Sequence, residues 1–137
     1  MLDKSHPKWR DAEERLRKEP ILWLTTVRED GQPQSSPVWF WWDGDALLVY
    51  SMPSAGKVAN IRGHPAVSVH LSDDGQGGDI VTMEGTAEIT RDPVAQHEGT
   101  YVGKYRQMIV DLGYDNQRFA KEYSTEIHIV PGRARLW

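Results

Sequence analysis

Apolar and polar positions along this chain form short segments that predict a small β-rich domain. In residues 5–18, apolar side chains recur at three- and four-residue spacing among charges, which predicts an amphipathic helix that ends before Pro20. Six later runs, apolar or alternating and bounded by Gly, Pro, Asp and Ser, predict strands. The predicted strands cover residues 21–28, 33–42, 46–51, 66–71, 80–90 and 125–130. Helical segments are predicted at residues 57–62, 92 to about 112, and 116–123.

Turn and capping residues refine these boundaries. Ser5 is the expected N-cap of the first helix, with Pro7 in its first turn. Asp92-Pro93 is expected to open a later helix in the same way. Gly85, in the middle of the fifth strand, predicts a bulge or a sharp bend. Pro131-Gly132 is expected to interrupt the last strand, with residues 133–137 as its continuation to the end.

The order of these elements predicts a mainly β fold. Six strands in hairpin order, with a short helix after the third and a longer helix before the last, are typical of a small closed or nearly closed Greek-key barrel with peripheral helices. The same order argues against a doubly wound α/β sheet. A length of 137 residues fits a single domain, with residues 1–19 as its N-terminal helical segment.

The predicted strand 33–42 is apolar on both of its faces. Side chains alternate between the faces of a strand. Val38, Phe40 and Trp42 therefore share one face, and Pro37, Trp39 and Trp41 share the other. The first face fits a barrel interior. The second face must also be covered, and we expect a partner subunit or a flat ligand to cover it.

Composition excludes several classes of function. The chain has no cysteine, which excludes disulfides, cysteine metal sites and a thiol nucleophile and fits a cytoplasmic protein. Its net charge is −4 with both signs interspersed, which argues against a nucleic-acid partner. No apolar run approaches the roughly 20 residues that span a bilayer, so no membrane partner is expected.

Most catalytic and metal motifs are absent from the sequence. The five histidines lack metal-site spacing, and there is no GxSxG, GxGxxG or Walker motif. Residues 73–79 are rich in Asp and Gly, but their spacing differs from that of a calcium loop and predicts a solvated loop.

Lys57 is the residue most suggestive of a binding site. It follows a break rich in Ser, Pro and Gly at residues 51–56 and opens a predicted helical turn. Backbone N–H groups at a helix N-terminus attract anions, and an ammonium beside them adds a point charge. Asn60 and Arg62 lie in the following turn and can extend a polar contact with a phosphate. From spacing alone, a solvated lysine remains the alternative.

Two motifs occur together in this chain. G-x-P-x-x-x-P-V-W-F spans residues 31–40, and K-x-x-N-[IL]-R spans residues 57–62. With the stretches LLVYS, VTMEGTAEI and the closing RARLW, the chain from Trp23 onward resembles the flavin and deazaflavin split-barrel family, whose fold is that of pyridoxamine-phosphate oxidase. More narrowly, it is similar to the F420-dependent actinobacterial branch of that family.

The resemblance implies a homodimer of six-stranded split barrels, with two cofactors in grooves at the subunit interface. It matches Lys57 to the lysine that binds the cofactor phosphate and Asn60 to its neighbour. Further cofactor-binding positions are implied at Ser51, Met52 and Ser54 beside the cofactor tail, at Ser36, Pro37 and Val38 along the tricyclic ring, at Trp39 bordering ring or substrate, at Arg62, and at Trp137 near the other subunit's site.

The implied function is an F420-dependent reductase. It would transfer a hydride between C5 of the deazaflavin and an electron-poor carbon of a conjugated small molecule. The alternatives are an FMN-dependent oxidoreductase of the same fold and a protein that binds F420 or a flavin without turnover. No residue is assigned as a proton donor, because the available tyrosines are equally expected in a core. Those tyrosines are Tyr50, Tyr101, Tyr105 and Tyr123.

The sequence departs from the family pattern beside Lys57. Many relatives carry an arginine one or two places before the lysine, where this chain has Ala55 and Gly56. A weaker phosphate contact is expected, with Arg62 or Arg28 compensating. The choice between F420 and FMN stays open at this point.

Overall fold

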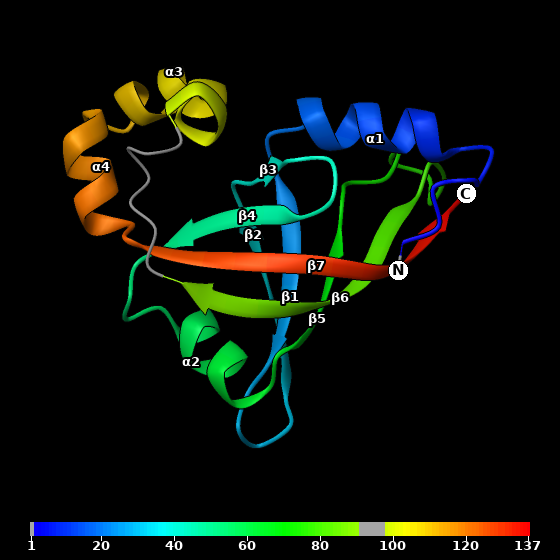
Figure 1. The fold of residues 1–137 in the computed structure, drawn as a ribbon, viewed down its shortest axis with the longest axis horizontal. Coiled ribbons are helices and arrows are strands. Elements are labelled where there is room, and N and C mark those ends of the chain that lie inside the picture. Colours follow the sequence, from blue (N-terminus) through cyan, green and yellow to red (C-terminus); the bar gives the residue numbers. More distant parts are fainter. Residues whose placement is uncertain (1, 91–97) are drawn as a thin grey trace.

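The chain folds into one curled antiparallel sheet with helices around it (Figure 1). This is a computed structural model, and it describes residues 2–90 and 98–137. The strand order across the sheet is β2-β1-β5-β6-β7-β4-β3. The strands are β1 (Leu22–Val27), β2 (Pro33–Val38), β3 (Trp41–Trp42), β4 (Leu47–Ser51), β5 (Ala66–His70), β6 (Val81–Thr90) and β7 (Thr125–Leu136). The helices are α1 (Trp9–Lys18), α2 (Gly56–Gly63), the π-helical turn η2 (Glu98–Val102), α3 (Gly103–Asp111) and α4 (Asn116–Glu122).

The mainly β fold with peripheral helices is confirmed, but the predicted count of six strands is wrong for the described residues. The seventh strand arises because the predicted strand 33–42 breaks at Trp39-Phe40. β2 pairs with β1, whereas β3 pairs with β4 at the other edge of the sheet. The two sheet edges are therefore joined by only two residues, and the sheet curls into a half-barrel.

The first helix begins later than predicted. α1 starts at Trp9, and the N-cap position is taken by Lys8, whose side chain makes no capping hydrogen bond. Ser5 does not cap the helix, because its backbone N–H and its hydroxyl both donate to Oδ1 of Asp3. The predicted helical period is confirmed from Trp9 onward. Trp9, Ala12 and Leu16 are all buried on one stripe of α1.

The predicted bulge at Gly85 is confirmed. The last strand is not interrupted at Pro131-Gly132, and its predicted continuation over residues 133–137 is confirmed as far as Leu136. The register shifts between Glu84, which lies opposite Arg133, and Gly85, which lies opposite Pro131. Gly132 is thus the extra residue of a bulge, and β7 continues through it to Leu136. The predicted helix start at Asp92-Pro93 lies outside the described residues.

Two apolar clusters stabilise the fold. The larger one fills the half-barrel and includes Val38, Phe40 and Trp42, as predicted. The second cluster lies between the outer face of β4 and the helices α3 and α4, and Trp39 and Trp41 pack against it. The chain's own helices therefore pack on Trp39 and Trp41 but leave both partly exposed, and a partner or ligand over the rest of this face stays a prediction.

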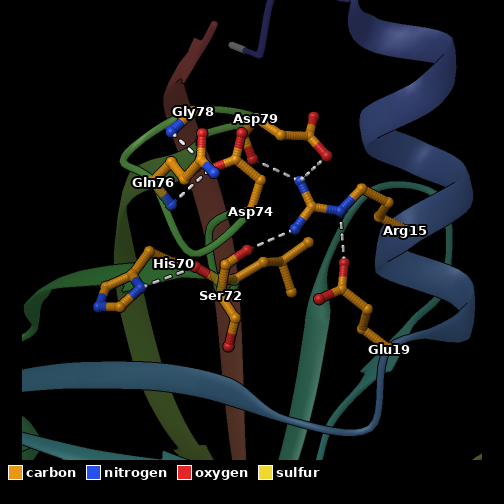
Figure 2. Close-up of polar contacts among 9 residues, drawn as sticks. Arg15, Glu19, His70, Ser72, Asp74, Gln76, Gly78 and Asp79 are labelled. Carbon is orange, nitrogen blue, oxygen red and sulfur yellow. Dashed lines mark hydrogen bonds and ion pairs between the residues drawn. The ribbon is translucent and has the colours of Figure 1, made fainter.

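Arg15 joins α1 to the loop at residues 72–79 (Figure 2). Its guanidinium donates to the carbonyl oxygens of Ser72 at 2.5 Å and Asp79 at 2.6 Å, at the two ends of the loop. Its Nε donates to Glu19 at 2.5 Å. Within the loop, Oδ1 of Asp74 accepts backbone N–H groups at 2.8 and 3.0 Å. These bonds leave the loop ordered against α1. Among residues 2–90 and 98–137, no group of acidic and histidine side chains is arranged to hold a metal ion.

Replacing Arg15 with methionine is expected to cost about 1 kcal/mol of unfolding free energy, because three charged hydrogen bonds, one of them part-buried, are lost while the apolar stem is kept. Hydrogen exchange should rise in residues 72–79. Arg17→Met is the matched control, since in the described part of the chain Arg17 makes one exposed ion pair, at 3.7 Å. Equal exchange in the two variants would contradict this role for Arg15.

Candidate functional site

Helix α2 closes the end of the half-barrel opposite α1 (Figure 1). Val58 and Ile61 bury on its inner side, at the three-residue spacing that the sequence predicts. The helix begins at Gly56, and Ala55 at the N-cap has no side-chain hydrogen bond to offer. The backbone N–H groups of Gly56 and Lys57 consequently have no hydrogen-bond partner among the described residues. This helix N-terminus can accept an anion.

Lys57 adds a positive charge to that helix start. Its side chain is half-buried, and it forms no hydrogen bond or ion pair with any residue that the structure describes. Burial lowers the pKa of its ammonium group. A partly desolvated cation without a counter-charge is unfavourable by itself. An anion bound beside it would offset this cost and raise the pKa again.

Asn60 lies about one helical turn after Lys57, on the same face of α2. Its side-chain Nδ2 donates to Oγ1 of Thr26 at 3.0 Å and to Oε1 of Gln34 at 3.3 Å. Both amide hydrogens are thus used within the protein, where they attach α2 to β1 and β2. Asn60 holds the Lys57 turn in place, and its direct contact with a cofactor stays a prediction.

The two arginines expected to compensate beside Lys57 make other contacts. Arg62 lies about 140° around the helix from Lys57, given about 100° per residue. It lines a hollow of about 300 Å³ beside the end of β6, with Ile89 and Thr90. Arg28 is paired with Asp30 in the β1–β2 turn. Arg28 also lines the cleft that adjoins Asn60, so compensation by Arg62 or Arg28 stays a prediction.

The predicted tail-binding residues lie in the segment between β4 and α2. Ser51 is buried at the end of β4, and its hydroxyl donates to the carbonyl oxygen of Met52 at 3.3 Å. Met52 and Ser54 are exposed. These residues lead directly into Gly56 and Lys57. The predicted tail-binding residues and Lys57 therefore belong to one continuous segment.

The predicted ring-binding residues end strand β2. Val38 is buried and faces the barrel interior, Ser36 is half-buried, and Pro37 is exposed opposite Trp23 of β1. In the described residues, β2 has a strand neighbour on one side only. Its outer backbone edge is therefore free to face a ligand.

Two tryptophans of the predicted set lie away from the Lys57 turn. Trp39 stacks on Tyr105 with ring centroids 4.7 Å apart and planes within 2°. Trp137 follows β7, whose first residue, Thr125, pairs with Ser51. At about 3.3 Å per residue, Trp137 lies roughly 40 Å along the strand from Thr125. It therefore lies at the far end of β7 from the strand end that leads into the Lys57 turn, and its contact with a partner's site stays a prediction.

The tyrosines considered as proton donors belong to the second apolar cluster or pack against it. Tyr50 donates to Oε2 of Glu126 at 2.9 Å, and Tyr105 donates to the carbonyl oxygen of Pro20 at 2.7 Å. Burial raises the pKa of Tyr101 and of Tyr105 well above the ordinary value. Tyr123 stacks on Phe119 at 4.5 Å. Their roles in the core are thus the ones that the structure supports.

Sequence reasoning missed a cleft of about 700 Å³ between the β1–β2 turn and α2. It is lined by Arg28, Glu29, Asp30, Ala59, Asn60, Gly63 and His64. No local motif marks it, because it forms where a hairpin turn meets a helix that is distant in sequence. It adjoins Asn60 and extends the candidate site along α2.

Comparisons with known proteins agree on the fold. A family model described as pyridoxamine 5'-phosphate oxidase matches residues 9–137. An F420 reductase of known structure is 25% identical, with a TM-score of 0.69 over 90% of this chain and 94% of that chain. A conserved hypothetical protein from Mycobacterium tuberculosis is 23% identical, with a TM-score of 0.73 over 93% and 82%. A FAD-binding protein from Mesorhizobium loti is 21% identical, with a TM-score of 0.68 over 91% and 88%.

Proposed function

This chain belongs to the pyridoxamine 5'-phosphate oxidase family, and from that premise we propose that it is an F420-dependent reductase acting on a conjugated small molecule. One observation carries the proposal. The half-buried Lys57, which has no partner among the described residues, opens an uncapped helix. That arrangement suits the phosphate of a flavin-type cofactor. The likeness to an F420 reductase at 25% identity supports the deazaflavin over other cofactors.

The residues of this chain would bind and orient the cofactor, which itself supplies hydride transfer at C5 of its ring. Lys57 and the backbone N–H groups of Gly56 and Lys57 would hold the phosphate. The outer edge of β2 at Ser36–Val38 would lie along the ring. The hydroxyls of Tyr50 and Tyr105 are hydrogen-bonded within the core, and we assign no proton donor from this chain.

Charge at the phosphate site favours F420 over FMN. The phosphate of F420 is a diester with one negative charge, whereas that of FMN is a monoester with nearly two charges at neutral pH. Relatives with an added arginine present two cations there. This chain has Ala55 and Gly56 in those places, while Arg28 is paired with Asp30 and Arg62 lies about 140° around α2 from Lys57. A single cation matches a singly charged phosphate better.

Turnover of reduced F420 tests the proposed activity. The purified protein would be mixed with reduced F420 and, separately, with quinones, enones and tetrapyrroles as acceptors, and oxidised F420 would be followed by absorbance. We expect oxidation with at least one acceptor class. Protein that purifies yellow with flavin absorbance would instead support an FMN-dependent oxidoreductase. Binding of F420 without oxidation by any acceptor would indicate a non-catalytic binding protein.

We further propose that the functional unit is a homodimer with the cofactor at the interface. The outer face of β1, β5 and β6 carries a shallow pocket with a volume of about 640 Å³. Trp23 lies half-exposed on this face and stacks beside His70. Such a surface suits a second subunit. The partner's last strand could then deliver Trp137 to the site.

Sedimentation at micromolar concentration should show a dimer, because the half-exposed Trp23 and the hollow beside it on this face suit cover by a second subunit. Trp23→Glu should shift the protein toward monomer. Leu112→Glu is the control, since Leu112 is 62% exposed near the end of α3 and away from this face. A stable wild-type monomer would contradict the two-subunit groove.

A further inference from the structure

The break between β2 and β3 is held by two neighbouring residues of α3. The Tyr105 hydroxyl accepts the backbone N–H of Phe40 at 2.8 Å and donates to the carbonyl oxygen of Pro20 at 2.7 Å. The Lys104 ammonium donates to the carbonyl oxygen of Phe40 at 3.1 Å. It also lies 3.8 Å from the centroid of the Phe40 ring. Side chains of α3 thus satisfy the backbone groups that a continuous strand would pair with a neighbouring strand.

The same helix holds the other residue of the break. The indole of Trp39 stacks on the fully buried ring of Tyr105, at 4.7 Å and nearly parallel. Ser36–Val38 precede Trp39 directly and form the end of β2. Because β2 has one strand neighbour in the described part of the chain, the path of its end depends on what holds Trp39 and Phe40.

We propose that Lys104 and Tyr105 are positioning residues for the cofactor ring. They hold the Trp39-Phe40 break in place, and this in turn fixes the position of the ring-binding edge of β2. This inference rests on the proposed function, since it requires a flavin-type ring along Ser36–Val38. It concerns the ring alone. The phosphate is assigned to Lys57, on another element.

Protonation of Lys104 gives this role a pH dependence. Burial lowers the pKa of Lys104 to about 8, while the negative charge of Glu19, at the end of α1, opposes this shift. Within residues 2–90 and 98–137, the other titratable group that faces Lys104 is Tyr105 on its own helix, whose pKa is raised by burial. Near pH 7 the ammonium is charged and attracts the Phe40 and Tyr105 rings. Above pH 8 that attraction is lost, so ring affinity should fall as the pH rises through this range.

Ligands with and without a phosphate separate ring positioning from phosphate binding. We would titrate F420 against its phosphate-free deazaflavin, and FMN against riboflavin, following ligand fluorescence. Lys104→Met and Tyr105→Phe should each weaken both members of a pair by about fivefold, leaving their ratio unchanged. Lys57→Ala should instead weaken only the phosphorylated member. Lys121→Met, at an exposed lysine of α4, is the matched control and should bind like wild type.

The pH profile distinguishes positioning from a general loss of stability. Wild-type affinity for the ring should fall between pH 7 and about 9. Lys104→Met should lose this dependence. Between pH 7 and about 9, Lys104→Arg should bind the ring with the affinity that the wild-type protein has at pH 7, because arginine stays charged. If Tyr105→Phe does not fold, the two Lys104 variants carry the test.

Two results would overturn the inference. If Lys104→Met binds riboflavin and the phosphate-free deazaflavin as wild type does, or keeps the wild-type pH profile, Lys104 does not position the ring while the proposed function stands. If the wild-type protein binds none of the four ligands, the proposed function fails and this inference fails with it.

Discussion

Lys57→Ala is expected to weaken cofactor binding by about 1.5–3 kcal/mol, which is roughly 10- to 150-fold in Kd. The physical reason is that Lys57 is a half-buried cation with no partner among the described residues. Its contact with the phosphate would be a charge-assisted hydrogen bond. Binding also raises its lowered pKa, so affinity should fall at alkaline pH. Fluorescence titration of wild type and variant measures the effect.

The helix phase supplies a contrasting variant. Arg62 lies on the same short helix but about 140° away from Lys57. Arg62→Ala should therefore change Kd by less than about threefold, the scale of an exposed and screened charge. An unchanged Kd in Lys57→Ala would remove Lys57 from the site. Equal losses in both variants would show that net charge, rather than the helix start, governs binding.

Gly85→Ala is expected to lower the unfolding free energy by about 1–3 kcal/mol, the range for overpacking. A Cβ at this position would lie 2.6 Å from the carbonyl oxygen of Val130 and 3.1 Å from Cα of Pro131. Both are backbone atoms of β7 and cannot move aside without opening the β6–β7 pairing. Denaturant unfolding monitored by tryptophan fluorescence measures the loss.

Gly132→Ala is the matched control for the bulge. Gly132 is the extra residue of the same bulge, and a Cβ there would have no atom of the described residues within 4 Å. The unfolding free energy of the Gly132→Ala protein should stay within about 0.5 kcal/mol of the wild-type value. Equal stability of the Gly85→Ala and Gly132→Ala proteins would contradict the close approach of β6 and β7 at Gly85.

Local pattern predicted most of the elements, and long-range contacts explain where it failed. The period of Trp9, Ala12 and Leu16 and the alternation through Val38, Phe40 and Trp42 depend on neighbours in sequence, and both are confirmed. The break at Trp39-Phe40 depends on α3 side chains that lie 64 and 65 residues away. No local propensity could predict it.

The site was predictable to the same extent. Lys57 at a helix start was predicted from a local break followed by a helical period, and the structure places it there. The family resemblance, rather than residue spacing, is what favours a phosphate-binding role for Lys57 over that of a solvated lysine. Sequence spacing predicts Arg62 beside Lys57 because the two are close in sequence, but helix geometry puts them on different faces of α2. Lys104 and Tyr105 carried no sequence signal, since their contacts with Phe40 exist only in the folded chain.

Titration of the wild-type protein with F420 and, separately, with FMN tests the central proposal most directly. The account predicts saturable binding of F420 that is tighter than that of FMN, because one cation at the Lys57 turn meets a singly charged phosphate diester. Absence of binding to either cofactor would contradict the cofactor site itself. Tighter binding of FMN would contradict the assignment of F420.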